Sequence, residues 1–148
     1  MELLRGHEIA LLVDVRSHPV SKWAPQFGRA ARARMLARHG IGYEFLGRQL
    51  GGRPEGTEFY GPDGAVDYGR RAEAPDFKAG IERLVDLAVE RKTAILCAEE
   101  DPGRCHRRLL VTPALRQKRV TVGHIRGGGR LEAEDPEADR SPQLPLFR

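Results

Sequence analysis

The stretch from Thr93 to Gln117, TAILCAEEDPGRCHRRLLVTPALRQ, contains the signals that decide the fold. Residues 93–98 form a short apolar run, which predicts a buried strand, and residues 107–117 have the composition of a helix. Two thiols, three carboxylates, an imidazole and several guanidinium groups lie on this strand and on the turn that joins it to the helix. In open α/β sheets such turns lie at the carboxyl edge of the strands, where ligands bind. This turn is therefore the first candidate for a functional site.

Three further apolar runs predict strands over residues 10–15, 41–46 and 120–125. Apolar residues at helical spacing predict a helix over residues 77–88, and an Arg-rich helix is predicted over residues 30–39. Pro113 is expected to kink or restart the helix that follows the Cys-His turn. Strands that alternate with helices predict a single α/β domain with a mainly parallel sheet and helices on both faces.

Two regions of the chain lie outside this alternation of strands and helices. Residues 47–67 are rich in Gly and Pro, which predicts a long functional loop or lid. The domain is predicted to span residues 1–130, and residues 131–148 are predicted to be a flexible acidic tail.

Composition limits the class of protein. The chain has 148 residues, of which 31% are charged, and a net charge of +4, so an anionic partner is permitted but not required. No run of residues is long and apolar enough to span a membrane, and no secretion signal is evident, so no membrane partner is expected. Only two cysteines are present, which favours a reducing cytoplasm over a structural disulfide.

Five blocks along the chain resemble a known family. They are Val13-Asp14-Val15-Arg16-Ser17 with Pro19, Gly40-Ile41-Gly42-Tyr43, Leu46-Gly47 with Leu50-Gly51-Gly52-Arg53, Cys97-Ala98-Glu99 with Cys105-His106-Arg107, and His124-Ile125. In this order, over roughly residues 3–126, they resemble the family called domain of unknown function 488. The resemblance implies a compact α/β fold. Because members usually open with a strand before the first helix, it also implies that the family's N-terminal strand is missing here.

Asp14, Arg16 and Ser17 lie at the end of the first predicted strand. Side chains two residues apart on a strand share a face, so Asp14 and Arg16 can pair as a structural salt bridge. Alternatively, they place an acid/base carboxylate and an anion-binding guanidinium at the carboxyl edge, with Ser17 beside them. The position at that edge favours the functional interpretation.

The Cys-His turn has three interpretations. Cys97, Cys105 and His106 are possible metal ligands, but their spacing matches no common zinc pattern, so neither a metal nor another cofactor is expected. As a catalytic residue, Cys105 at a helix N-terminus beside His106 would have a lowered pKa and act as a nucleophile. As an anion site, Arg104, Arg107 and Arg108 at the same helix N-terminus would bind phosphate, and this interpretation is favoured.

Other residues add to the candidate site. Glu99 follows a strand directly, which makes it the best candidate for a general base, with Asp14 and His106 as further acid/base groups. Tyr43 suits stacking on a base or a sugar, core packing being the alternative. Arg53 follows two glycines, where the backbone can approach a ligand closely. His124 is interpreted as a core histidine.

Two features point to larger partners. Arg29, Arg32, Arg34 and Arg38 form a basic helix face that suits nucleic acid, a solvated face being the alternative. In the terminal peptide QLPLF, Gln143, Leu144, Leu146 and Phe147 match the peptide by which bacterial proteins bind the sliding clamp, and Pro145 departs from it. The alternative is that this peptide folds back onto its own domain.

These features predict an enzyme that acts on a phosphate-bearing substrate, either a nucleotide or DNA, in DNA replication or repair. One alternative is a non-catalytic module that binds nucleic acid or a nucleotide and is recruited to the sliding clamp. The other is a thiol or metal sensor that uses Cys97, Cys105 and His106.

Overall fold

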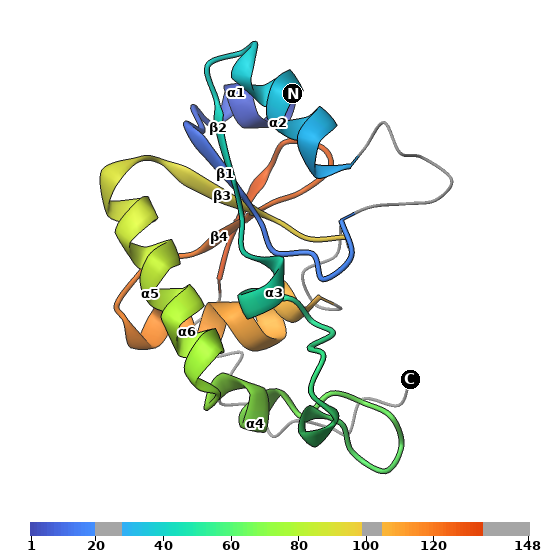
Figure 1. Ribbon diagram of the computed structural model, residues 1–148. Helices are drawn as coiled ribbons and strands as arrows, with labels where there is room; N and C mark the ends of the chain where they lie inside the picture. Colours follow the sequence, from blue (N-terminus) through green and yellow to red (C-terminus); the bar gives the residue numbers. More distant parts are fainter. Residues whose placement is uncertain (20–27, 99–104, 135–148) are drawn as a thin grey trace.

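The computed structural model describes residues 1–19, 28–98 and 105–134, and these contain a three-stranded parallel sheet in the order β2-β1-β3. Strand β1 is Leu11–Asp14, β2 is Gly42–Phe45 and β3 is Thr93–Leu96 (Figure 1). In the register, Val13 of β1 lies beside Glu44 and Ile95. Three of the predicted strands are therefore confirmed, and they form the parallel sheet that the alternation of elements predicted.

Helices cover both faces of this sheet. They are α1 (Glu2–Gly6), α2 (Arg29–Ala37), α5 (Pro75–Glu90) and α6 (Thr112–Gln117). Leu11 and Val13 pack in a core with α5 and α6, whereas Leu12 points to the opposite face and packs against Leu36 of α2 and Leu4 of α1. Because both faces are covered, every residue of β1 is buried.

The longest helix follows its sequence pattern closely. Phe77, Ile81, Leu84 and Leu87 recur at helical spacing in α5, and all four are buried against the sheet. Pro75 stands in the first turn, where its missing N–H costs no intrahelical hydrogen bond. The helix predicted over residues 77–88 is thus confirmed.

Pro113 shapes the chain after the Cys-His turn. A wide π-helical turn, Arg107–Val111, precedes α6. Pro113 cannot donate to the carbonyl of Leu109, and its ring would clash there in a regular helix. The turn is widened instead, and the Thr112 hydroxyl donates to the carbonyl of Arg107 at 2.8 Å. Pro113 therefore restarts the helix, as predicted.

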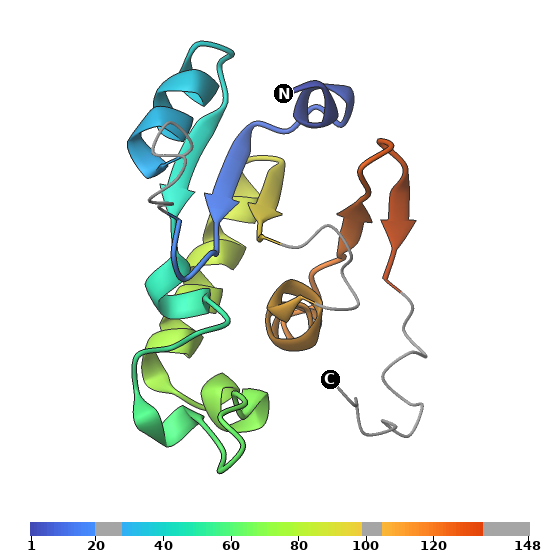
Figure 2. The ribbon, with the colours of Figure 1, turned by 90° about the vertical axis from the view of Figure 1, so that its right-hand side faces the viewer.

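The fourth predicted strand does not join the parallel sheet. Strand β4 (Gly123–Ile125) pairs antiparallel with β5 (Leu131–Ala133), and Figure 2 shows this hairpin on the β3 side of the sheet. Strand β5 lies inside the predicted tail, so the ordered domain extends beyond its predicted end at residue 130. The glycine-rich link between two short strands is a hairpin signal that the prediction missed. At the hairpin tip, His7 Nε2 donates to the carbonyl of Gly129 at 2.7 Å.

The predicted loop over residues 47–67 contains short ordered elements. These are helix α3 (Gly47–Leu50), the single turn η2 (Thr57–Phe59) and an isolated bridge between Tyr60 and Val66, and they are followed by helix α4 (Tyr68–Ala72). Helix α3 packs against α5, and this contact fixes the position of the chain where the segment begins. None of the helices in the described part of the chain combines the length and the apolar character needed to cross a membrane.

Candidate functional site

Three segments meet at the carboxyl edge of the parallel sheet. They follow β1, β2 and β3, and two hydrogen bonds join them. His106 Nε2 donates to the carbonyl of Val15 at 3.0 Å, and the Arg53 backbone N–H donates to Ser17 Oγ at 2.9 Å. The fold thus brings together the first-strand residues, Arg53 and the Cys-His turn, as the sequence predicted. Glu99 and Arg104 lie outside the described residues.

Asp14 forms a closed network with Arg16 and Tyr43. Its Oδ1 accepts from Arg16 N at 3.1 Å and Arg16 Nε at 2.9 Å, while its Oδ2 accepts from Arg16 Nη2 and the Tyr43 hydroxyl, both at 2.7 Å. The Asp14 side chain is fully buried and that of Arg16 is 16% exposed. Of the two interpretations left open by the sequence, the structure forms the salt bridge.

The network fixes the charges of its members. Burial of Asp14 favours the neutral acid, but the hydrogen bonds from Arg16 and Tyr43 outweigh it and lower the pKa of the carboxyl group. Burial and the hydrogen bond to Asp14 raise the pKa of Tyr43 to about 12. Near neutral pH, Asp14 is therefore a charged acceptor with both oxygens occupied. This arrangement anchors Arg16 and leaves Asp14 little capacity to take a proton from a ligand.

The glycine segment after α3 approaches the other two segments closely. A Cβ on Gly51 would lie 2.2 Å from Ser17 Oγ, and a Cβ on Gly52 would lie 2.9 Å from Cγ and Nδ1 of His106. Only glycine allows the backbone to pass at these distances. The close approach positions Arg53, whose guanidinium makes no ion pair with any described residue.

His106 is held in a defined protonation state. Because a carbonyl oxygen only accepts, the hydrogen bond to Val15 places a proton on Nε2. Burial lowers the pKa of His106, so the ring is neutral near pH 7. Its Nδ1 then carries a lone pair, and Cys105 Sγ lies 3.8 Å from this nitrogen. A neutral histidine of fixed tautomer can accept a proton at Nδ1.

Cys105 does not have the lowered pKa that its position predicted. Its thiol is buried, and a hydrogen bond with Cys97, together with burial, raises its pKa. The Arg107 N–H reaches Cys105 Sγ at 3.4 Å and acts in the opposite direction, but it does not prevail. The contact between the two thiols forms only in the folded chain, so the sequence alone did not predict it. Neither cysteine forms a disulfide, and no three His, Cys, Asp or Glu side chains converge as metal ligands within the described segments.

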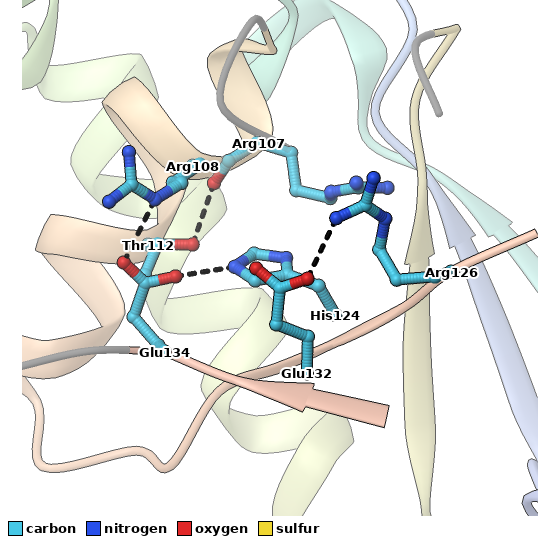
Figure 3. Close-up of polar contacts among 7 residues, drawn as sticks. All are labelled: Arg107, Arg108, Thr112, His124, Arg126, Glu132 and Glu134. Atoms are coloured by element: carbon cyan, nitrogen blue, oxygen red, sulfur yellow. Dashed lines mark hydrogen bonds and ion pairs between the residues drawn. The ribbon is translucent and has the colours of Figure 1, made fainter. Parts of the chain in front are cut away.

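A second polar cluster joins the hairpin to the π-helical turn (Figure 3). Glu134 contacts His124 Nε2 with one oxygen at 2.5 Å and accepts from Arg108 Nε with the other at 3.2 Å. The side chains of His124 and Glu134 are 2% and 7% exposed. Figure 3 also shows the side chain of Arg107 reaching toward Arg126 of the hairpin. The interpretation of His124 as a core histidine agrees with this burial, but its partner was missed because β5 was missed.

Arg71, a residue that the sequence did not single out, holds the residues that precede the glycine segment. It is fully buried, and it donates to both carboxylate oxygens of Asp76, at 2.8 and 3.0 Å. It also donates to the carbonyls of Arg48 and Gln49, the residues of α3 that precede Leu50 and the glycines. Arg71 therefore ties the start of α5 to the end of α3 and fixes the approach of Gly51 and Gly52 to the site.

A family model, described as domain of unknown function DUF488, matches residues 1–113. The chain belongs to this family. The match covers the parallel sheet and the whole carboxyl-edge site, whereas the β4–β5 hairpin lies beyond it. No curated protein and no solved structure shows a significant match.

Proposed function

We propose that this DUF488 protein binds the phosphate group of a nucleotide or a nucleic acid at the carboxyl edge of its sheet. The observation that carries the proposal is the position of Arg53. This residue follows two glycines that press against Ser17 and His106, and its guanidinium has no ion-pair partner among the described residues. Arginine binds phosphate through paired N–H groups, and carboxyl edges of parallel sheets are where such ligands bind.

The same geometry gives Arg16 a different role in the proposed phosphate site. Its guanidinium already donates two hydrogen bonds to Asp14, so its charge is largely compensated. Arg16 therefore shapes the site and holds the Ser17 backbone in place, while Arg53 supplies the charge for the ligand. Ser17 Oγ, which accepts from the Arg53 N–H, retains its own proton for a phosphate oxygen.

Proton transfer, if the phosphate-bearing ligand reacts, belongs to His106 in this proposal. It is neutral near pH 7 and carries its lone pair on Nδ1, whereas Asp14 is occupied and Cys105 retains its proton. Glu99, which follows β3 in the sequence, stays a proposed general base. DNA replication or repair is the proposed context because of the terminal peptide.

The test is calorimetric titration of the full chain with inorganic phosphate and with a nucleoside monophosphate. Replacing Arg53 with Ala should weaken both affinities by about tenfold to a hundredfold, because a hydrogen bond to a charged group contributes about 1.5–3 kcal/mol. Arg119→Ala removes an equally charged, exposed side chain at the far end of α6 and should leave both affinities unchanged. Equal affinity of the Arg53→Ala and wild-type proteins would reject the proposal.

For the partner, we propose that residues 143–147 bind the bacterial sliding clamp. These residues lie outside the described part of the chain, and the support is the sequence match at Gln143, Leu144, Leu146 and Phe147. Surface-immobilised clamp should capture the full chain but not a chain that ends at residue 142. A variant with Ala at Leu146 and Phe147 should behave like the shortened chain, since apolar anchors carry such contacts. Capture of all three proteins alike would remove the clamp as a partner of this peptide.

A further inference from the structure

The surface beside the site carries a concentrated positive charge. From Val15 to Tyr43 the sequence has six Lys and Arg residues and no Asp or Glu. Helix α2 lies within this stretch, and its four arginines are Arg29, Arg32, Arg34 and the C-cap residue Arg38. No acidic side chain of the described residues pairs with any of the four. Within the described part of the chain, the charge of α2 is therefore available to an anionic ligand.

The four arginines divide between two sides of α2. Arg29 lies over the ring of Phe45 at 3.8 Å, and Arg32 is half-buried with an Nε that has no hydrogen-bond partner among the described residues. Arg34 and Arg38 are four residues apart, lie on the side opposite the buried Leu36, and are exposed. Four residues rise about 6 Å along a helix, which spans about two phosphates of one nucleic-acid strand.

The rest of the exposed side of α2 is built from small residues. Ala30 and Ala37 are exposed between the arginines, so a polymer backbone can approach the helix closely. Met35 is the single large apolar side chain that α2 exposes, at 40%. A helix that lies on a membrane needs a broad apolar face opposite its basic one, and α2 lacks this face. Its charge pattern favours a nucleic-acid backbone over a lipid surface.

The position of α2 connects this surface to the carboxyl edge. Its first residue, Arg29, stacks on Phe45, which ends β2 at that edge, and helix α3 leads from β2 to the glycine segment with Arg53. Figure 1 shows α2 beside β2, and the two elements pack together. A strand lying along Arg38 and Arg34 therefore runs toward the start of α2, beside the carboxyl edge that carries the proposed phosphate site.

We infer that the ligand of the phosphate site is a polynucleotide, and that α2 binds its sugar–phosphate backbone through Arg34 and Arg38. This inference rests on the proposed function and narrows it from any phosphate-bearing ligand to a nucleic-acid strand. Backbone contacts of this kind carry no sequence information, so binding is independent of base sequence.

The experiment measures the fluorescence anisotropy of a labelled single-stranded oligonucleotide of mixed sequence over a series of salt concentrations. The double variant Arg34→Gln/Arg38→Gln should bind about tenfold more weakly at low salt, from two lost surface ion contacts. The slope of log affinity against log salt should fall by about 1.4, since each phosphate contact on a single strand contributes about 0.7. The control Lys118→Gln/Arg119→Gln makes the same charge change at the exposed end of α6 and should keep the wild-type slope.

The outcomes separate this inference from the proposed function. If the α2 variant loses oligonucleotide affinity but keeps its affinity for a nucleoside monophosphate, the inference is supported. If the α2 variant and the control have the same slope while Arg53→Ala still loses phosphate binding, the inference fails and the phosphate site stands. If oligonucleotide binding depends on α2 but not on Arg53, the phosphate site fails instead. Binding of vesicles of phosphatidylserine, without binding of the oligonucleotide, would overturn the inference in favour of a lipid surface.

Discussion

The carboxyl-edge site and the hairpin cluster both combine a histidine, a carboxylate and an arginine, but they connect them differently. At the carboxyl edge, Asp14 binds Arg16 and Tyr43, and His106 contacts the Val15 carbonyl and Cys105 Sγ but no carboxylate of the described residues. In the hairpin, Glu134 binds His124 directly, and Arg108 occupies its other oxygen. The first arrangement leaves a neutral imidazole beside a glycine segment, and the second occupies both carboxylate oxygens of Glu134. The first is therefore the arrangement that we propose for a ligand, and the second fastens β5 to the domain.

The largest expected effect is the loss of the buried charge at the carboxyl edge. Replacing Asp14 with Ala leaves the mostly buried Arg16 without its partner, which should lower the free energy of unfolding by about 3–5 kcal/mol. Urea denaturation measures this change. The exposed pair of Glu44 and Arg83 is the control, and Glu44→Ala should change the unfolding free energy little. Equal effects of the two substitutions would show that the Asp14 network is not an anchor.

The hairpin cluster should give a smaller and more local effect. Replacing Glu134 with Gln removes one of its two acceptor contacts and should cost about 1–3 kcal/mol. Because β4 and β5 pair only with each other among the described strands, the loss should appear as faster amide hydrogen exchange in the hairpin. Amide groups of β1 should exchange at the wild-type rate. Uniformly faster exchange throughout the sheet would mean that the hairpin is part of the main cooperative unit.

The contrast also shows how far the sequence could predict this molecule. The strands β1, β2 and β3 and helix α5 follow from local apolar patterns, and their order places Ser17, Arg53 and His106 at one edge. Strand β5 has three residues, of which Leu131 and Ala133 are exposed, so no apolar pattern marks it.

Contacts between distant residues account for the other differences. The bond from Tyr43 to Asp14 spans 29 positions, and the one from Arg71 to Gln49 spans 22. The contact between Cys97 and Cys105 reversed the expected direction of the Cys105 pKa. Each of these pairings depends on the packed structure, and no spacing rule for a single helix or strand contains them.

The smallest expected effect, and the one that separates the two histidine environments, is a pH dependence. Burial holds the pKa of His106 below 6.5, its usual value, in the folded state. As the pH falls through 6.5, the unfolded chain gains a proton at this position while the folded chain does not, so the free energy of unfolding decreases. The decrease should appear between about pH 7.5 and pH 5.5, above the range in which carboxyl groups titrate.

Two measurements test this dependence on the same protein. A nuclear magnetic resonance titration of the His106 ring should give a midpoint below 6.5. Urea denaturation of His106→Gln, whose amide can still donate to the Val15 carbonyl, should show a flatter dependence on pH over the same range than the wild-type protein shows. An unchanged slope in this variant, or a ring that titrates above 6.5, would mean that His106 is not held neutral by burial. The carboxyl-edge site would then lose its proposed proton acceptor. The two clusters would differ only in how accessible they are to a ligand.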